Sequence, residues 1–190
     1  MRLSGFTFRG ISKLIAAFLI LSFPLVWAAE REVGLGIGQK APDFSLRDVY
    51  DKEYHLSKMR TDLIILIFGN RKTRKEADKW ALAIKKEFRD LLKKPKELVA
   101  LQVGDVSGKP FFITRSFVKR WLKRKRTILP MPLDWDGRIS KLYKVPKDKP
   151  MIYLIQNGRI VWKMASKMRK EKFKKLKAAV NRFVKVKPSL

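Results

Sequence analysis

The sequence predicts an α/β fold in which a mixed central β-sheet carries helices on both faces. Residues 62–68 (DLIILIF) and 98–103 (LVALQV) are short, mostly apolar runs with helical spacing between them. Continuous apolarity indicates strands that are covered on both sides, as in a parallel sheet between helices. Nearer the C-terminus, the Asn-Gly pair at 157–158 indicates a hairpin, which adds antiparallel strands to the sheet.

The other elements follow from the spacing of apolar residues. Residues 44–56 alternate apolar and polar side chains around a turn, which predicts two short strands. Apolar residues recur at helical spacing over 77–91, and the following Lys94-Pro95 ends that helix because a residue before proline avoids the helical conformation. Further helices are expected at 111–126 and 170–184, a short element at 139–145, and strands at 133–137, 151–155 and 159–163.

The N-terminal segment has the order of charge and apolarity of a secretory signal peptide. Arg2, Arg9 and Lys13 precede an uncharged run of 16 residues, from Leu14 to Ala29. A membrane-spanning helix needs about 20 apolar residues, so we favour a cleaved signal peptide over an uncleaved inner-membrane anchor. The protein is therefore expected to be periplasmic or otherwise exported, with inner-membrane anchoring as the alternative.

We expect a signal peptide at 1–28, a flexible lead-in at 29–37 and one domain at 38–186. Three glycines between residues 34 and 38 indicate the loose lead-in, because glycine-rich segments form loops. The remaining chain is long enough to bury a hydrophobic core of its own.

The composition is strongly basic, with 45 Lys and Arg against 17 Asp and Glu and a net charge of +28. Residues 1–28 contain three of the cations and no acid, so the remainder carries +25. Such an excess favours anionic partners. For an exported protein these are lipid headgroups or an acidic envelope polymer, unless the charge only keeps the domain soluble. Nucleic acid is disfavoured by the export signal and by the lack of an aromatic-stacking motif.

The chain contains no cysteine and one histidine. It therefore has no disulfide, no thiolate nucleophile and no thiolate metal site. Zinc and iron sites generally need cysteine or several histidines, so we expect no metal and no cofactor. Asp134 and Asp136 lack the further ligands of a calcium loop and are expected to form a tight Asp-Gly turn.

Three segments match motifs of one protein family in the same order. Residues 38–48 (GQKAPDFSLRD) match G-x-x-A-P-D-F-x-L-x-D, and residues 133–137 (LDWDG) match L-D-x-D-G. Residues 149–160 (KPMIYLIQNGRI) match the strand that starts at the family's cis-proline. The chain thus resembles the redoxin branch of the thioredoxin superfamily, which contains peroxiredoxins and TlpA-like proteins. The resemblance covers about residues 36–184 and implies a thioredoxin-like three-layer fold with thiol-based redox activity.

The corner that follows strand 62–68 is where this family keeps its redox-active Cys-x-x-C. Here the corner reads Asn70-Arg71-Lys72-Thr73, so Asn70 and Thr73 occupy the two cysteine positions. Thiol–disulfide exchange and peroxide reduction need a thiolate, which asparagine cannot supply. Threonine attacks only when a base activates it, and the corner has no histidine. We therefore assign no catalytic residue.

Two interpretations of the corner stay open. Thr73 and Glu76 have the spacing of a capping box, in which each side chain bonds a backbone amide of the helix start. Alternatively, free helix amides together with Arg71, Lys72 and Arg74 bind an anion. We favour the cap, because it accounts for both residues without a ligand.

Two further features rest on resemblance. The family's cis-proline corresponds to Pro150, beside which such proteins present strand backbone to an extended peptide; that surface needs only main-chain groups. Residues 69–76 and 107–117 are also similar to segments of the YtfJ-type periplasmic family, a cysteine-poor thioredoxin-like group of unassigned function.

The predicted helix at 111–126 is basic and has no acidic residue. Its apolar spacing favours a surface helix whose aromatic side chains belong to the core, which leaves the basic face exposed. The alternative is an interfacial helix with phenylalanine and tryptophan toward lipid. Its cations are Arg115, Lys119, Arg120, Lys123, Arg124, Lys125 and Arg126.

The sequence therefore predicts an exported, redox-inactive thioredoxin-fold protein that binds an anionic envelope component or a protein partner. The binding surfaces would be the corner at residues 70–73 with Pro150, and the basic helices. The alternative is a redoxin-family thiol–disulfide oxidoreductase or peroxiredoxin-like antioxidant protein, which rests on the resemblance of fold alone.

Overall fold

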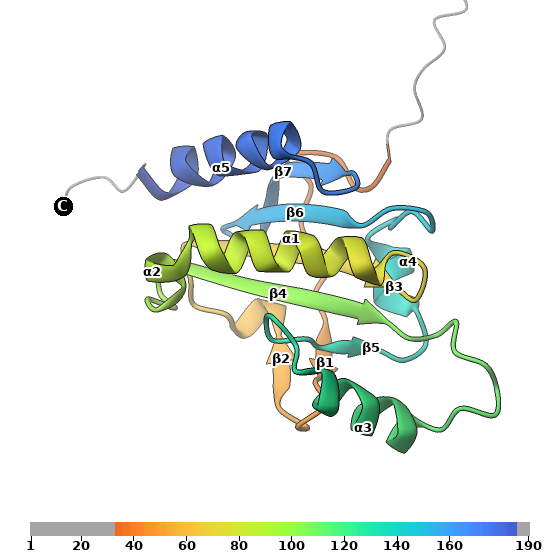
Figure 1. Ribbon diagram of the computed structural model, residues 1–190. Coiled ribbons are helices and arrows are strands. Elements are labelled where there is room, and N and C mark those ends of the chain that lie inside the picture. Colours follow the sequence, from red (N-terminus) through yellow and green to blue (C-terminus); the bar gives the residue numbers. More distant parts are fainter. Residues whose placement is uncertain (1–32, 186–190) are drawn as a thin grey trace, which may run out of the picture. The chain divides into compact units, whose positions relative to one another are not determined.

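A computed structural model describes residues 33–185, and a seven-stranded mixed sheet forms its centre (Figure 1). The strand order is β2-β1-β5-β4-β3-β6-β7. The central strands β3 (Leu63–Asn70), β4 (Leu98–Asp105) and β5 (Leu133–Asp134) are parallel, whereas β6 (Met151–Gln156) runs antiparallel to β3. The mixed sheet predicted from the apolar runs is confirmed.

The edges of the sheet are antiparallel. On one side, β7 (Arg159–Ala165) pairs with β6, and the connecting Asn157 and Gly158 both have positive φ, at 50° and 71°. The Asn-Gly pair suits this turn because it tolerates positive φ. On the other side, β1 (Ser45–Arg47) pairs with β5 and with β2 (Glu53–His55).

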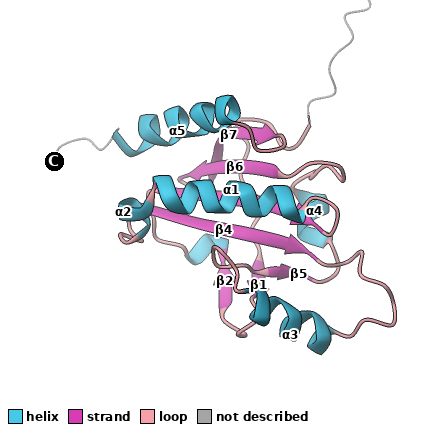
Figure 2. Ribbon diagram, viewed as in Figure 1, coloured by secondary structure: helices cyan, strands magenta, loops and turns pink. Residues whose placement is uncertain are grey.

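Helices cover both faces of the sheet, as predicted (Figure 2). On one face, α1 and α5 pack against β3 and β6. On the other face, α4 packs with the segment before β1, while α3 contacts the β5 side. The helices are α1 (Arg74–Glu87), α2 (Arg89–Leu92), α3 (Arg115–Lys125), α4 (Arg138–Leu142), α5 (Lys170–Lys185) and the 3₁₀ turn η1 (Leu56–Lys58).

Three of the buried polar groups in the two cores form hydrogen bonds that link separate segments. On the α1 face, the buried Trp80 indole donates to the Ser166 carbonyl over 2.9 Å. On the α4 face, the Tyr153 hydroxyl donates to the Tyr143 carbonyl over 2.6 Å and accepts from the Leu35 amide over 2.9 Å. Burial raises the pKa of Tyr153 to about 12, so the hydroxyl remains a donor at neutral pH.

The hydrogen bond from the Leu35 amide to Tyr153 attaches part of the predicted lead-in to the folded domain. Its described part, from residue 33 to 37, is linked to β6 by this buried contact, and the flexibility of the lead-in at 29–37 stays a prediction. The predicted signal peptide at 1–28 lies outside the described residues. Within residues 33–185, no helix is long and apolar enough to cross a membrane.

Candidate functional site

The corner between β3 and α1 is closed by its own hydrogen bonds. The Asn70 Oδ1 atom accepts from the amides of Lys72, over 2.8 Å, and Thr73, over 3.1 Å. The Thr73 hydroxyl accepts from the Asn70 amide over 2.9 Å and lies 3.3 Å from Asn70 Oδ1. The two residues at the cysteine positions therefore bond each other and occupy amides that an anion would otherwise use.

The predicted capping box is wrong. Thr73 has φ −99° and ψ −1°, a helical conformation instead of the extended one that a cap residue adopts, and its hydroxyl turns back to Asn70. Glu76 does not reach back either. Its carboxylate accepts from the Met168 amide over 3.1 Å and from the Lys79 amine over 2.6 Å, and the Lys79 bond lowers the pKa of Glu76.

The corner is also linked to the segment before Pro150. The Asn70 Nδ2 atom donates to the Lys147 carbonyl over 3.1 Å. The predicted cis-proline is wrong, because residues 33–185 contain no cis peptide bond. The trans form of such a bond is the intrinsically favoured one, by about 0.5–1 kcal/mol. The Pro150 carbonyl accepts from the Ser166 amide over 3.1 Å, so this acceptor is already used within the chain.

A cavity of about 470 Å³ lies next to the corner, between the start of α1, the end of β4 and α3. We call it the corner cavity. Val118, Trp121, Leu122 and other apolar side chains form its walls. Four cationic residues also line it, namely Arg71, Arg74, Lys75 and Lys109. These four cations outnumber the one carboxylate of the lining, that of Asp105, so the cavity suits a ligand that has both an apolar part and a negative charge.

Two residues that line the corner cavity each have a buried polar atom without a hydrogen-bond partner. Gln102, from β4, is only 2% exposed; its Nε2 atom donates to Asp78 over 2.7 Å, but its Oε1 atom has no partner within the described residues. The same holds for the Nε atom of Arg74, whose guanidinium lies 4.3 Å from the Trp121 ring centre and 3.6 Å from Asp78. Buried polar groups normally have hydrogen-bond partners, so these two atoms are candidate contacts for a ligand.

The segment before α3 exposes aromatic side chains. Phe111 and Phe112 are 96% and 71% exposed, and Phe117 is 50% exposed. The rings of Phe111 and Phe112 pack edge to face, with their centroids 5.5 Å apart. The prediction that the aromatic side chains belong to the core is wrong for these phenylalanines, whereas Trp121 is half-buried and packs against the core cluster around the buried Leu122. The helix starts later than predicted, after Thr114, so the Phe pair lies in the preceding loop.

The predicted basic residues of this region do not all face solvent in the same way. Lys119 forms an ion pair with Asp51 and is only half exposed. Arg115 and Lys123 lie over the rings of Trp135 and Tyr50, at 5.2 and 5.3 Å from the ring centres. These contacts fix α3 against its neighbours. The exposed cations further along the segment are Arg120, Arg124, Lys125 and Arg126.

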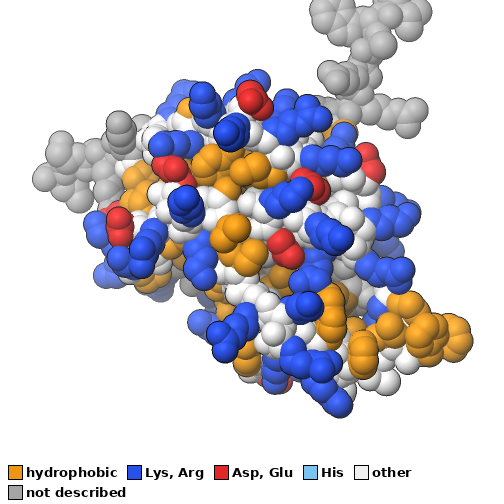
Figure 3. Space-filling view, viewed as in Figure 1, with side chains coloured by type: hydrophobic (Ala, Val, Ile, Leu, Met, Phe, Trp, Pro, Cys, Tyr) orange, Lys and Arg blue, Asp and Glu red, His pale blue; other side chains and the backbone are white. Residues whose placement is uncertain are grey.

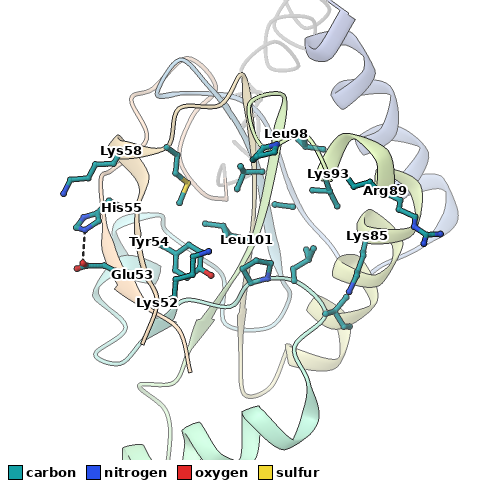
Figure 4. A pocket seen from close by; sticks show the side chains of 18 residues that line it. Lys52, Glu53, Tyr54, His55, Lys58, Lys85, Arg89, Lys93, Leu98 and Leu101 are labelled. Atoms are coloured by element: carbon teal, nitrogen blue, oxygen red, sulfur yellow. Dashed lines mark ion pairs between the residues drawn. The ribbon is translucent and has the colours of Figure 1, made fainter. Parts of the chain in front are cut away.

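A second cavity, of about 800 Å³, lies at the other end of β4 (Figure 4). We call it the distal cavity. Lys85, Arg89 and Lys93 line one side, and Leu98 and Leu101 lie in the middle. The single histidine is at the opposite wall, where its Nε2 atom lies 3.2 Å from a Glu53 oxygen. Within residues 33–185, no group of three or more His, Cys, Asp and Glu residues is arranged to hold a metal ion.

The carboxyl edge of the parallel strands is polar, because Asn70, Asp105 and Asp134 are in register on β3, β4 and β5. Asp134 is fully buried and accepts from the Ser140 amide over 2.8 Å, and its burial raises the pKa. The predicted Asp-Gly turn is present: Gly137 has φ 71°, and a Cβ atom there would lie 2.7 Å from the neighbouring Ser107 hydroxyl.

Fold and corner together define a redoxin-type protein without its thiols. The sequence profile of the AhpC/TSA family matches residues 37–164, and the chain belongs to this family. Among curated proteins, no sequence matches the chain.

Solved structures share the fold. A putative thiol:disulfide interchange protein DsbE from Chlorobium tepidum is 18% identical, with a TM-score of 0.61 over 79% of this chain and 99% of that one. A putative protein disulfide isomerase from Bacteroides thetaiotaomicron is 22% identical, with a TM-score of 0.64 over 80% and 94%. An exposed lipoprotein thioredoxin from Streptococcus pneumoniae is 25% identical, with a TM-score of 0.55 over 72% and 99%.

Sequence reasoning found the corner but missed the cavity beside it. The available signal was Gln102, the one polar side chain within the apolar run at 98–103. A polar residue in a strand buried on both faces needs a partner, and asking for that partner would have pointed to this side of the sheet. No comparable signal links Arg74 to Trp121, because they lie on separate helices.

Proposed function

We propose that this chain is an exported, redox-inactive member of the AhpC/TSA family that acts as a binding module. Its ligand is an anionic molecule with an apolar part, which enters the corner cavity. The observation that carries this proposal is the pair of unpartnered polar atoms, on Gln102 and Arg74, at an apolar cavity next to a corner without a thiol.

The chemistry of the cavity defines the ligand class. The apolar walls favour an acyl or aromatic group, since burial of apolar surface contributes about 25 cal/mol per Å². The guanidinium of Arg74 favours a carboxylate or phosphate, with which arginine forms charge-assisted bonds. The free Gln102 Oε1 atom adds an acceptor for a hydroxyl or amide of the ligand. Envelope lipids and their fragments combine these groups, as does a protein segment with acidic and apolar side chains.

Export is supported by two observations. The N-terminal 28 residues read as a signal peptide in the sequence. In addition, one structure with a similar fold is described as an exposed lipoprotein thioredoxin. An envelope ligand and an exported protein are mutually consistent.

The second candidate is a thiol–disulfide oxidoreductase or peroxiredoxin-like protein, which family membership favours. The chain has no cysteine to carry this chemistry. The pure protein is therefore expected to neither reduce insulin disulfides nor consume peroxide above the buffer rate. Turnover in either assay would revive this candidate.

The binding proposal is tested with three amphiphiles of equal chain length: decanoate, decanol and decyltrimethylammonium. Trp121 lines the cavity, so binding is followed through tryptophan fluorescence, and a Trp121→Phe variant identifies its signal. We expect decanoate to bind at least tenfold more tightly than the other two, below micellar concentrations. Val118→Trp, which fills the cavity, should abolish that preference. Equal affinity for all three ligands would contradict the proposal.

A further inference from the structure

The region after β4 combines extreme charge with exposed aromatic side chains. Residues 106–133 contain eight Lys and Arg residues and no Asp or Glu. Phe111 and Phe112 sit in the loop before α3 and are the most exposed large apolar side chains of the described residues. In Figure 3, a hydrophobic group protrudes beside the place that α3 occupies in Figure 1, with Lys and Arg side chains around it.

This arrangement differs from an ordinary basic surface. Exposed aromatic neighbours are unfavourable in water, and their grouping marks a surface that contacts something apolar. Cations alone would suffice to bind an acidic polymer, which offers no apolar interior. A lipid bilayer offers both, because aromatic side chains enter the boundary between headgroups and acyl chains while Lys and Arg contact anionic headgroups.

We propose that the protein docks on an anionic lipid bilayer through the loop around Phe111 and Phe112. The two rings insert into the headgroup–acyl boundary. Lys109 and Arg115 flank the rings in sequence, and Arg120 and Arg124 extend the basic surface along α3. The ion pair between Lys119 and Asp51 and the two cation–π contacts hold α3 in place, so the loop is presented on a fixed helix.

Docking goes beyond the ligand of the corner cavity and does not depend on it. The two are nevertheless neighbours, because Lys109, Pro110, Ile113 and Phe117 line that cavity and belong to the same region. A bound bilayer would therefore lie close to the cavity wall that this region forms. The docking experiment measures vesicles and the cavity experiment measures single amphiphiles, so either can fail while the other succeeds.

The test is sedimentation of residues 29–190 with vesicles of phosphatidylcholine alone or with about 30% phosphatidylglycerol, whose anionic headgroups attract polybasic segments. The sheet and both cores lie within residues 33–185, so this part retains the folded unit. We expect binding only to the anionic vesicles. The double variant F111S/F112S should bind at least tenfold more weakly, with an unchanged melting temperature because both side chains are exposed.

A matched control is L82S/L142S, which removes two exposed leucines elsewhere on the surface and should bind as the wild type does. Insertion is measured directly with F112W, whose emission should shift to the blue on vesicle addition. The proposal is overturned if F111S/F112S binds like the control, if F112W shows no shift, or if polyphosphate binds equally well to wild type and F111S/F112S while vesicles do not bind.

Discussion

The two cavities lie at opposite ends of β4 and differ in whether the buried polar atoms of their lining residues all have hydrogen-bond partners. Both are lined by apolar and cationic side chains. The distal cavity is larger, yet none of its lining residues has a buried polar atom without a partner among the described residues. The corner cavity has two, on Arg74 and Gln102. Both cavities thus have volume and positive charge. Buried polar atoms without partners distinguish the corner cavity from the distal cavity.

Position in the fold supports the same distinction. The corner cavity lies at the carboxyl ends of the parallel strands β3 and β4, where α/β sheets commonly bind ligands. The distal cavity lies at the amino end of β4. This edge of the sheet has no cysteine, yet a cavity lies there. The difference teaches that a cavity at this edge does not require the family's thiols.

The largest expected difference between the cavities comes from exchanging one arginine at each. Arg74→Gln should weaken decanoate binding by about 2 kcal/mol, roughly thirtyfold, because it removes a charged hydrogen-bonding partner from a low-dielectric site. Arg89→Gln, at the distal cavity, should leave binding unchanged. Isothermal titration of both variants measures this. Equal losses would mean that the amphiphile responds to overall charge.

The second-largest effect concerns the close approach of Gly69 in β3 to Ala77 in α1. A Cβ atom on Gly69 would lie 2.8 Å from the Ala77 Cβ atom, so β3 and the first turn of α1 would have to separate. Gly69→Ala should lower the free energy of unfolding by about 2 kcal/mol, as overpacked cores typically do. Gly108→Ala has open space and serves as the control. Urea denaturation of both variants would refute the account if their midpoints coincided.

A smaller effect tests whether Gln102 is retained for binding. Gln102→Met removes the unpartnered Oε1 atom, which favours stability, but it also removes the Nε2 hydrogen bond to Asp78, so we expect the melting temperature to change little. The same change should weaken a ligand that donates to this atom, such as 3-hydroxydecanoate, more than it weakens decanoate. Thermal unfolding and ligand titration measure the two effects. A Gln102→Met protein that is less stable and binds both ligands normally would make Gln102 a purely structural residue.

The smallest effect is the pH dependence that Asp134 introduces. Burial raises the pKa of its carboxyl above the ordinary 3.8, so its ionisation costs stability in the folded state. The stability that protonated Asp134 contributes is therefore full below about pH 4 and is lost as the pH rises through the raised pKa. Asp134→Asn should flatten this part of a melting-temperature profile between pH 4 and 7. A profile with an unchanged slope would show that the aspartate is ionised without penalty.

Much of the fold could be predicted because it depends on short-range patterns. The continuous apolarity of β3 and β4 predicted strands covered on both faces, and the Asn157-Gly158 turn predicted the β6–β7 hairpin. The start of α3 could not be read in the same way, because Phe111 and Phe112 continue its apolar spacing into a loop.

The site was predicted only in part, because its geometry depends on contacts between distant segments. The sequence located the corner at residues 70–73, but the spacing of Thr73 and Glu76 suggested mutual capping. In the fold, the Thr73 hydroxyl accepts from the Asn70 amide, and the Glu76 carboxylate accepts from the Met168 amide. Met168 is far from Glu76 along the chain, so no local spacing predicts this contact. The corner cavity likewise needs α1, β4 and α3 to meet, which no local pattern encodes.

The most direct test of the central claim compares the two cavities in one experiment. Isotope-labelled protein is titrated with decanoate, and amide, side-chain amide and indole signals are followed by nuclear magnetic resonance. We predict the largest shifts at the Gln102 side-chain amide and the Trp121 indole, both of which line the corner cavity. Shifts concentrated at Lys85, Arg89 and Lys93 of the distal cavity, with the Gln102 and Trp121 signals unmoved, would contradict the account.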